Sequence, residues 1–160
     1  MLDAIVAVYA DWGIGAKGTQ PVALKADRRR FRELTEGGAV IVGRRTLADF
    51  PGGKPLKNRV NIVLTRQDLS IEGAGIAGSA EQALKLAAPH PRAYIIGGES
   101  VYREFLPHIS RVCATKIAMT PHSDVFFPDL DADPAWRVAE MGEAAEENGV
   151  RYRFLTYERV

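Results

Sequence analysis

The feature that most constrains the fold is a set of short, almost fully apolar segments that recur along the chain. Each has the length and composition of a strand buried on both faces of a sheet. Helix-like segments separate them, and strands that alternate with helices form largely parallel sheets. The apolar runs are “LDAIVAVYA” from Leu2, “AVIVG” from Ala39, “RVNIVLT” from Arg59, “RAYIIGG” from Arg92 and “RVCATKIAM” from Arg111.

The remaining segments complete an α/β pattern. Helices are expected at about 24–35, 44–50, 79–88 and 99–107, with Ser79 as an N-cap, a loop at 11–21 and a weak strand at 73–78. Near the C-terminus, “WRVAEMGEAA” and “VRYRFLTYERV” alternate apolar and polar residues and predict an antiparallel hairpin. We therefore expect one domain, residues 1–160, with a mostly parallel sheet of about eight strands, this hairpin at one edge and about four flanking helices.

Composition limits the class of partner. The 160 residues carry a net charge of +1, which favours neither nucleic acid nor a membrane surface, so an anion site must be local. Cys113 is the only cysteine and is expected to be a buried small apolar residue, while the three histidines lack metal-ligand spacing. Without a signal-peptide pattern or a membrane-length apolar stretch, a cytoplasmic location is expected. We also expect a monomer that binds no metal.

One carboxylate stands where an apolar residue is expected. In “ALKADRRRFRELT”, helical geometry of about 100° per residue places Asp27 on one stripe with Leu24, Phe31 and Leu34. Burying a carboxylate is unfavourable unless a partner compensates it, and desolvation raises its pKa. Asp27 could therefore hold a ligand, or it could be the N-cap of this helix, and the residues alone leave both open.

Ligands of open α/β sheets collect where strands end and helices begin. The first such junction, “GIGAKG” (residues 13–18), suits a mobile glycine-rich loop beside a ligand. It also matches the G-x-G-x-x-G dinucleotide pattern, but Gln20 and Pro21 interrupt the passage to a helix and no acid closes the next strand. A third possibility is that the glycines of residues 13–18 only form a turn between two elements.

Three further junctions could bind anions. Arg44 and Arg45 follow a strand at a helix start, and Thr65 and Arg66 follow the next strand. If these strands are neighbours, a hydroxyl and three guanidiniums converge and suit the phosphate monoester of NADP, although solvated strand ends would look the same. In “YIIGGESVY” (residues 94–102), two glycines before a helix could hold a pyrophosphate, or simply form a tight turn.

Taken in order, these segments resemble the dihydrofolate reductase family over the whole chain. The segments that carry the resemblance are “AIVAV…WGIG”, “D…F…T” at Asp27, Phe31 and Thr35, “VIVGRRT”, “PLKNRVNIVLTR”, “YIIGGESVY”, “TKI” and “FFPD”. The resemblance implies hydride transfer from NADPH to the C6=N5 bond of 7,8-dihydrofolate, with protonation at N5 by a water. The cofactor carries the hydride chemistry and the protein orients the reactants.

The resemblance also implies residue roles. Asp27, supported by Thr115, would hold the pterin and act in catalysis, and Arg59 would bind the carboxylate of the glutamate tail. The expected substrate residues are Ile5, Asp27, Arg28, Phe31, Phe50, Leu56, Arg59, Ile96, Tyr102 and Thr115. The expected cofactor residues are Ala7, Ile14, Gly15, Thr19, Gln20, Gly43, Arg44, Arg45, Thr46, Leu64, Thr65, Arg66, Gly97, Gly98, Glu99, Ser100, Val101 and Tyr102. The family's Gly-Gly bond is cis.

Three positions depart from the family pattern. Val22 stands where tryptophan is common, Lys25 where proline is common, and Arg28 where an apolar residue touches the substrate. Arg28 could instead meet the glutamate tail. Two alternatives therefore stay open: reduction of another pterin or of a pyrimidine precursor on the same fold, and a non-catalytic NADPH-binding module. A purely structural protein would need none of these anion sites.

Overall fold

A computed structural model describes residues 2–16 and 22–160. In chain order the elements are β1 (Leu2–Tyr9), β2 (Gly13–Gly15), α1 (Lys25–Thr35), β3 (Ala39–Gly43), α2 (Arg44–Ala48), β4 (Val60–Leu64), β5 (Ala74–Ala77), α3 (Ala80–Ala87), β6 (Ala93–Ile95), α4 (Glu99–Phe105), β7 (Arg111–Ile117), β8 (Val125–Phe126), β9 (Trp136–Met141), β10 (Ala145–Glu147) and β11 (Val150–Arg159). Single 3₁₀ turns occupy Pro51–Gly53 and Leu106–His108. None of the helices in these two ranges has the length and apolar composition needed to cross a membrane.

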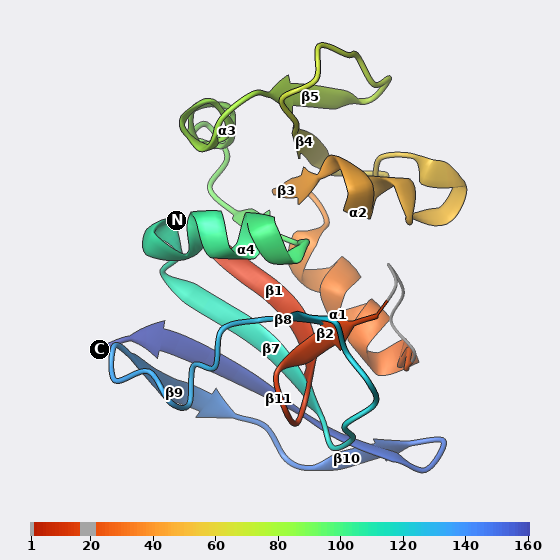
Figure 1. Ribbon diagram of the computed structural model, residues 1–160, viewed down its shortest axis with the longest axis vertical. Coiled ribbons are helices and arrows are strands. Elements are labelled where there is room, and N and C mark those ends of the chain that lie inside the picture. The colour runs from red at the N-terminus through yellow and green to blue at the C-terminus, as the bar shows by residue number, and fades with distance from the viewer. Residues whose placement is uncertain (1, 17–21) are drawn as a thin grey trace.

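The central sheet runs in the order β10-β11-β7-β1-β6-β3-β4-β5, with β9 also paired to β11 (Figure 1). All pairs from β7 through β1, β6, β3 and β4 to β5 are parallel, and every pair that β11 makes is antiparallel. This arrangement confirms the expected fold class, with β9 extending the edge beyond the eight strands of the main path.

The C-terminal hairpin is attached at the β7 edge, as the alternating pattern predicted. Asn148 and Gly149 both have positive φ, which is the conformation that a tight Asn-Gly hairpin turn requires. The single strand expected before the turn is interrupted, and β9 and β10 pair with different parts of β11. Because β11 lies between β7 and this edge, residues near the chain end pair directly with the strand that carries Thr115.

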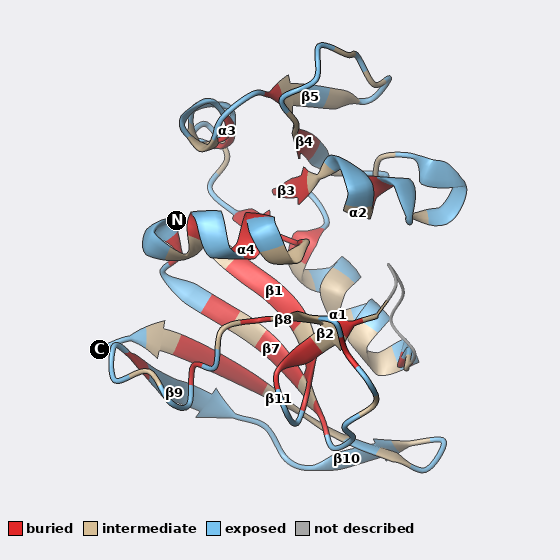
Figure 2. Ribbon diagram, viewed as in Figure 1, coloured by how far each residue is buried: buried red, intermediate tan, exposed pale blue. Residues whose placement is uncertain are grey.

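Apolar clusters cover the two faces of the sheet. One joins alternate residues of β1 to α3 and α4, and a second joins Ile5 of β1 to Phe31 of α1 and Leu47 of α2. A third, smaller cluster joins Tyr9 of β1 and Ile117 of β7 to Leu24, next to α1. Burial is concentrated in the central strands, whereas β9 and β10 are mostly exposed (Figure 2). The helices α1 and α2 therefore share one face, and α3 and α4 the other.

Strand β2 corrects the expectation of a plain loop at 11–21. Gly13 and Gly15 pair with Phe126 and Val125 of β8 in a small second sheet. A side chain at Gly13 is excluded, because its Cβ would lie 2.2 Å from Ser123 Oγ. A pairing of two to three residues between distant segments leaves no periodic signal, so it could not be predicted from local sequence.

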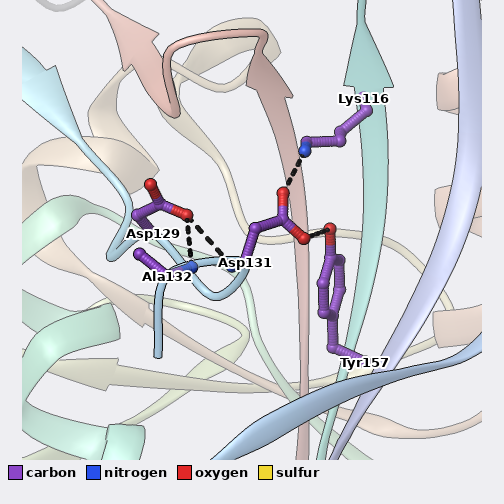
Figure 3. A network of polar contacts seen from close by, with 5 residues as sticks. All are labelled: Lys116, Asp129, Asp131, Ala132 and Tyr157. Carbon is purple, nitrogen blue, oxygen red and sulfur yellow. Dashed lines mark hydrogen bonds and ion pairs between the residues drawn. The ribbon is translucent and has the colours of Figure 1, made fainter. Parts of the chain in front are cut away.

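A polar network holds the segment after β8 against the sheet (Figure 3). Lys116 Nζ lies 2.5 Å from Asp131 Oδ2, and the Tyr157 hydroxyl donates to Asp131 Oδ1 at 2.9 Å. Asp129 Oδ1 accepts from the backbone N–H groups of Asp131 and Ala132, which tightens the turn. Since side chains alternate along a strand, Lys116 and Thr115 of β7 point to opposite faces of the sheet.

Candidate active site

Helix α1 places Asp27 in its first turn, facing the sheet. The N-cap is Leu24, without a side-chain cap, so the interpretation of Asp27 as the N-cap is wrong. Leu24 is buried and Phe31 is partly buried, whereas Arg28 is exposed. The helical stripe predicted from the sequence is therefore confirmed, and it directs the carboxylate of Asp27 inward.

The carboxylate of Asp27 has one side-chain partner on the sheet. The hydroxyl of Thr115, which is 2% exposed, donates to Asp27 Oδ1 at 2.6 Å. Burial raises the pKa of Asp27, while the hydrogen bond from Thr115 and the charges of Arg30 and Arg28 act in the opposite direction. Desolvation is the larger effect. The site thus contains a carboxyl group with a raised pKa and a fixed orientation.

A cavity of about 670 Å³ opens beside this carboxyl group. The expected substrate and nicotinamide residues that line it are Ile5, Ala7, Ile14, Gly15, Asp27, Phe31, Phe50, Ile96 and Tyr102. Sequence reasoning missed Val6, Ala16, Asp49, Asp124 and Val125, which line it as well. The β2–β8 pairing places Asp124 and Val125 at the cavity, and no local sequence pattern indicates that pairing.

Besides Thr115, which contacts Asp27, three expected substrate residues lie outside this cavity lining. Leu56 packs against the same buried apolar cluster as Phe31 and Phe50, and Arg28 is exposed on α1. The guanidinium of Arg59 lies 5.9 Å from the Phe31 ring centroid, and its Nε is buried without a protein partner. Partial burial lowers the pKa of Arg59, and its buried Nε–H is a donor that could bind a ligand carboxylate.

A second cavity, of about 800 Å³, adjoins the first. Expected cofactor residues line it: Gly43, Arg44, Arg45, Thr46, Leu64, Thr65, Arg66, Gly98, Glu99, Ser100 and Val101. Gln67, Gly78, Ser79 and Glu104 were not expected there. The three arginines converge because β3 and β4 are parallel neighbours with Gly43 opposite Leu64, which confirms the condition set from the sequence. Both cavities share Arg45, Thr46, Gly98, Glu99 and Val125.

The two glycines before α4 form the wall between the cavities. The Gly97–Gly98 peptide bond is cis, as the resemblance implied. A Cβ at Gly98 would lie 2.9 Å from Thr46 Oγ1, so no side chain fits there. The buried hydroxyl of Tyr102 donates to the backbone oxygen of Ile5 at 2.6 Å and ties α4 to β1. Backbone groups are therefore open to a ligand at this wall.

The remaining predictions concern the glycine-rich segment. Gly13–Gly15 form a strand, so they are not the turn into a helix that a dinucleotide fingerprint requires, and that alternative is wrong. Thr19 and Gln20, expected beside the nicotinamide, lie outside the described residues.

Comparison with known proteins gives one consistent match. The profile of the dihydrofolate reductase family matches residues 1–159. The dihydrofolate reductase of Mycobacterium leprae (strain TN) is 39% identical over 152 residues, which cover 91% of this chain and 90% of that protein. That of Bacillus subtilis (strain 168) is 32% identical over 162 residues, covering 99% and 95%.

A solved structure agrees with these relatives. Dihydrofolate reductase from Enterococcus faecalis, complexed with NADP(H) and RAB-propyl, superposes with a TM-score of 0.90 at 31% identity, covering 99% of this chain and 96% of that one. The family profile, the curated relatives and the solved fold all match nearly the whole chain. This chain belongs to the dihydrofolate reductase family.

Proposed function

We propose that this protein reduces 7,8-dihydrofolate to 5,6,7,8-tetrahydrofolate with NADPH. The observation that carries the proposal is the pairing of Asp27 with Thr115 in a cavity that adjoins an arginine-lined one. A buried carboxylate suits a ligand with adjacent N–H donors, and an arginine-lined cavity suits a phosphorylated cofactor. Family membership supports the same reaction.

The second cavity fits the phosphate groups of NADPH. Arg44, Arg45 and Arg66 supply charge for a phosphate monoester. Gly98 and Gly43 leave the wall bare, because a Cβ at Gly43 would lie 3.1 Å from Val101 Cγ2. When bound, NADPH supplies the hydride. The residues of the first cavity then orient the two rings and exclude bulk water.

The substrate's two ends meet groups of opposite charge. Asp27 accepts hydrogen bonds from the pterin ring N–H and amino group, and Thr115 keeps its carboxylate oriented. Arg59 binds the glutamate carboxylate, for which its desolvated Nε is an available donor. Arg28, exposed one residue after Asp27, contributes to the tail end of the site. Recognition at both ends fixes the position of the reacting C6.

Protonation at N5 depends on the charge of Asp27 rather than on direct contact. A carboxylate held beside the pterin favours its protonated form, and a water delivers the proton to N5.

Val22, in place of a tryptophan, packs with Tyr9 and Leu24, and its backbone N–H donates to the Tyr9 hydroxyl at 3.1 Å. The Tyr9 hydroxyl thus anchors Val22 just before α1.

The proposal is tested by NADPH oxidation with dihydrofolate, comparing the wild type with Asp27→Asn. The amide still accepts from Thr115 but carries no charge, so we expect a loss of turnover on the order of 100-fold. The loss should grow as the pH rises, because only substrate already protonated in solution then reacts. Glu33→Gln, an exposed position on the same helix, is the matched control and should retain activity.

Two results would redirect the assignment. If the wild type binds NADPH but leaves dihydrofolate unchanged, reduction of another pterin or of a pyrimidine precursor becomes the better hypothesis. Binding without turnover on any of these compounds would indicate a non-catalytic NADPH-binding module.

The proposal also includes a monomer, since one chain lines both cavities, and a cytoplasmic location. Sedimentation equilibrium and cell fractionation test those two points.

A further inference from the structure

Arg30 is held against the sheet one turn after Asp27. Its Nη1 donates to the backbone oxygen of Ala114 at 3.2 Å, and its guanidinium carbon lies 4.5 Å from the centroid of the Phe154 ring. The residue is only partly exposed, unlike Arg29 next to it. A hydrogen bond at one edge and an aromatic ring at the face leave this guanidinium little freedom.

The two residues that contact Arg30, Ala114 and Phe154, are also neighbours of Thr115, the hydrogen-bond partner of Asp27. Ala114 directly precedes Thr115 on β7, and Phe154 is the register partner of Thr115 on β11. Residues three apart on a helix are surface neighbours, so Asp27 and Arg30 face the same strand pair. The distance between this cation and the carboxylate is therefore set by packing rather than by a mobile side chain.

Arg30 forms none of the direct ion pairs found within the described residues. Its charge nevertheless lowers the pKa of Asp27 against the effect of burial, and it also lowers that of Cys113. The other groups facing Asp27 are exposed Arg28 on α1, Thr115 on β7 and the buried hydroxyl of Tyr102 on α4, whose pKa is raised by burial and by the charge of Asp27.

Arg28 and Arg30 differ in how far water weakens their effect. Arg28 is exposed, so solvent and salt screen its charge. Arg30 is partly buried and fixed, so its field at the carboxylate is screened less. A hydrogen bond to Ala114 requires only a neutral donor, whereas partly burying a cation is unfavourable unless a nearby negative charge, here that of Asp27, compensates it.

We propose that Arg30 is a positioning residue that keeps Asp27 charged in its cavity and limits how strongly the site attracts a proton onto the bound pterin. The first part concerns the protein alone. The second part rests on the proposed function, because it requires that the pterin binds against Asp27. Arg30 does not line either cavity and so acts through Asp27 rather than on the reactants.

The first part is tested by NMR titration of the Asp27 carboxyl carbon in ligand-free protein labelled with ¹³C-aspartate. Arg30→Gln keeps a donor for Ala114 but removes the charge, so Asp27 should titrate at a higher pH than in the wild type. Arg30→Lys keeps the charge and should titrate close to the wild type. Arg29→Gln, which removes an exposed charge next to it, is the matched control and should have little effect.

A titration in Arg30→Gln that coincides with that of the wild type, in a variant shown to be folded by its thermal transition, would overturn the proposal. If Arg30→Gln does not fold, Arg30→Met keeps an apolar stem over Phe154 and decides the same question. Neither measurement requires turnover, so the assignment of Arg30 can fail or succeed independently of the proposed reaction.

The second part is tested by the pH profile of dihydrofolate reduction. Without the cation, the carboxylate attracts a proton onto the substrate more strongly, so turnover should persist to higher pH. We expect the midpoint of the kcat profile to rise by about half a pH unit in Arg30→Gln, so that kcat at a pH well above the midpoint rises about threefold relative to kcat at a pH well below it. A purely structural role would lower kcat equally at both pH values and would contradict this part.

Discussion

At the scale of one residue, Asp27 is a side chain of the site that lowers the stability of the ligand-free fold. Its carboxyl group lies on the apolar face of α1, where burial raises its pKa, and a single hydroxyl supports it. In the absence of ligand, the charged form is therefore disfavoured in the folded state relative to the unfolded chain. The residue is explained by its proposed ligand rather than by packing.

Asp27→Asn should make the ligand-free protein more stable at pH 7, by roughly 2–4 °C in Tm, the change that about 1 kcal/mol produces in a domain of this size. Because the folded pKa is raised, the unfavourable contribution of Asp27 is complete above that pKa and disappears as the pH falls below the unfolded value. Melting curves at pH 7 and in acid test this. A variant less stable than the wild type at pH 7 would contradict it.

The position of the residue follows from local pattern, whereas its partner does not. The helical stripe of Leu24, Asp27 and Phe31 could be predicted because helical periodicity is a local property. Thr115 was assigned only by family resemblance, since 88 residues separate the two side chains that share the hydrogen bond. Arg30 lies outside that stripe, and nothing local indicated Phe154 as its neighbour.

At the scale of elements, α1 depends on the C-terminal hairpin. Leu24 offers the helix no cap, and the carboxylate of Glu147 on β10 accepts from the backbone N–H groups of Lys25 at 2.7 Å and Ala26 at 3.1 Å. These two hydrogen bonds lower the pKa of Glu147. The hairpin thus satisfies amide groups that the first turn leaves open, in the same turn that carries Asp27.

Glu147→Ala should loosen the first turn of α1, with several-fold faster amide exchange at Lys25 and Ala26. Glu146→Ala, on the neighbouring exposed position, is the control and should leave both amides unchanged. Since the folded pKa of Glu147 is lowered, its stabilising contribution is complete above the unfolded pKa and is lost as the pH falls through the folded one. In acid, the amide exchange rates of Lys25 and Ala26 should therefore become alike in the two variants. Equal rates in the two variants at neutral pH would rule out a capping role for Glu147.

Elements with strong local signals were predicted well. Ser79 accepts from the Gln82 N–H, as its place before a helix indicated, and the apolar runs form β1, β3, β4, β6 and β7. The short β2 and β8 and the division between β9 and β10 were missed. Each depends on a pairing partner that is distant in sequence, so local composition contains no signal for it.

At the scale of the whole molecule, both cavities share one wall, and the strand near the chain end pairs with β7. Five residues belong to both cavities, among them Thr46 and Gly98. The expectation that residues 1–160 are one domain stays a prediction. Because β11 lies inside the sheet rather than at its edge, we expect the chain to unfold as one unit.

Calorimetry should give one unfolding transition, and NADPH at 100 times its Kd should add about 2.7 kcal/mol to the free energy of unfolding. NADH is the matched control, because it lacks the phosphate that Arg44, Arg45 and Arg66 are proposed to bind. It should stabilise the protein much less at the same concentration. Two separate transitions, or equal stabilisation by both cofactors, would contradict this picture.

What the sequence by itself determined is the set of strands and helices with strong periodicity, the inward direction of Asp27 and the order of motifs typical of dihydrofolate reductases. These features depend on backbone geometry and composition over a few residues. The tertiary structure alone decided that Thr115 meets Asp27, that Phe154 and Ala114 hold Arg30, and that Glu147 caps α1. Each of these contacts joins segments far apart in the chain, and only the pairing of β11 with β7 and the packing of α1 on them bring those segments together.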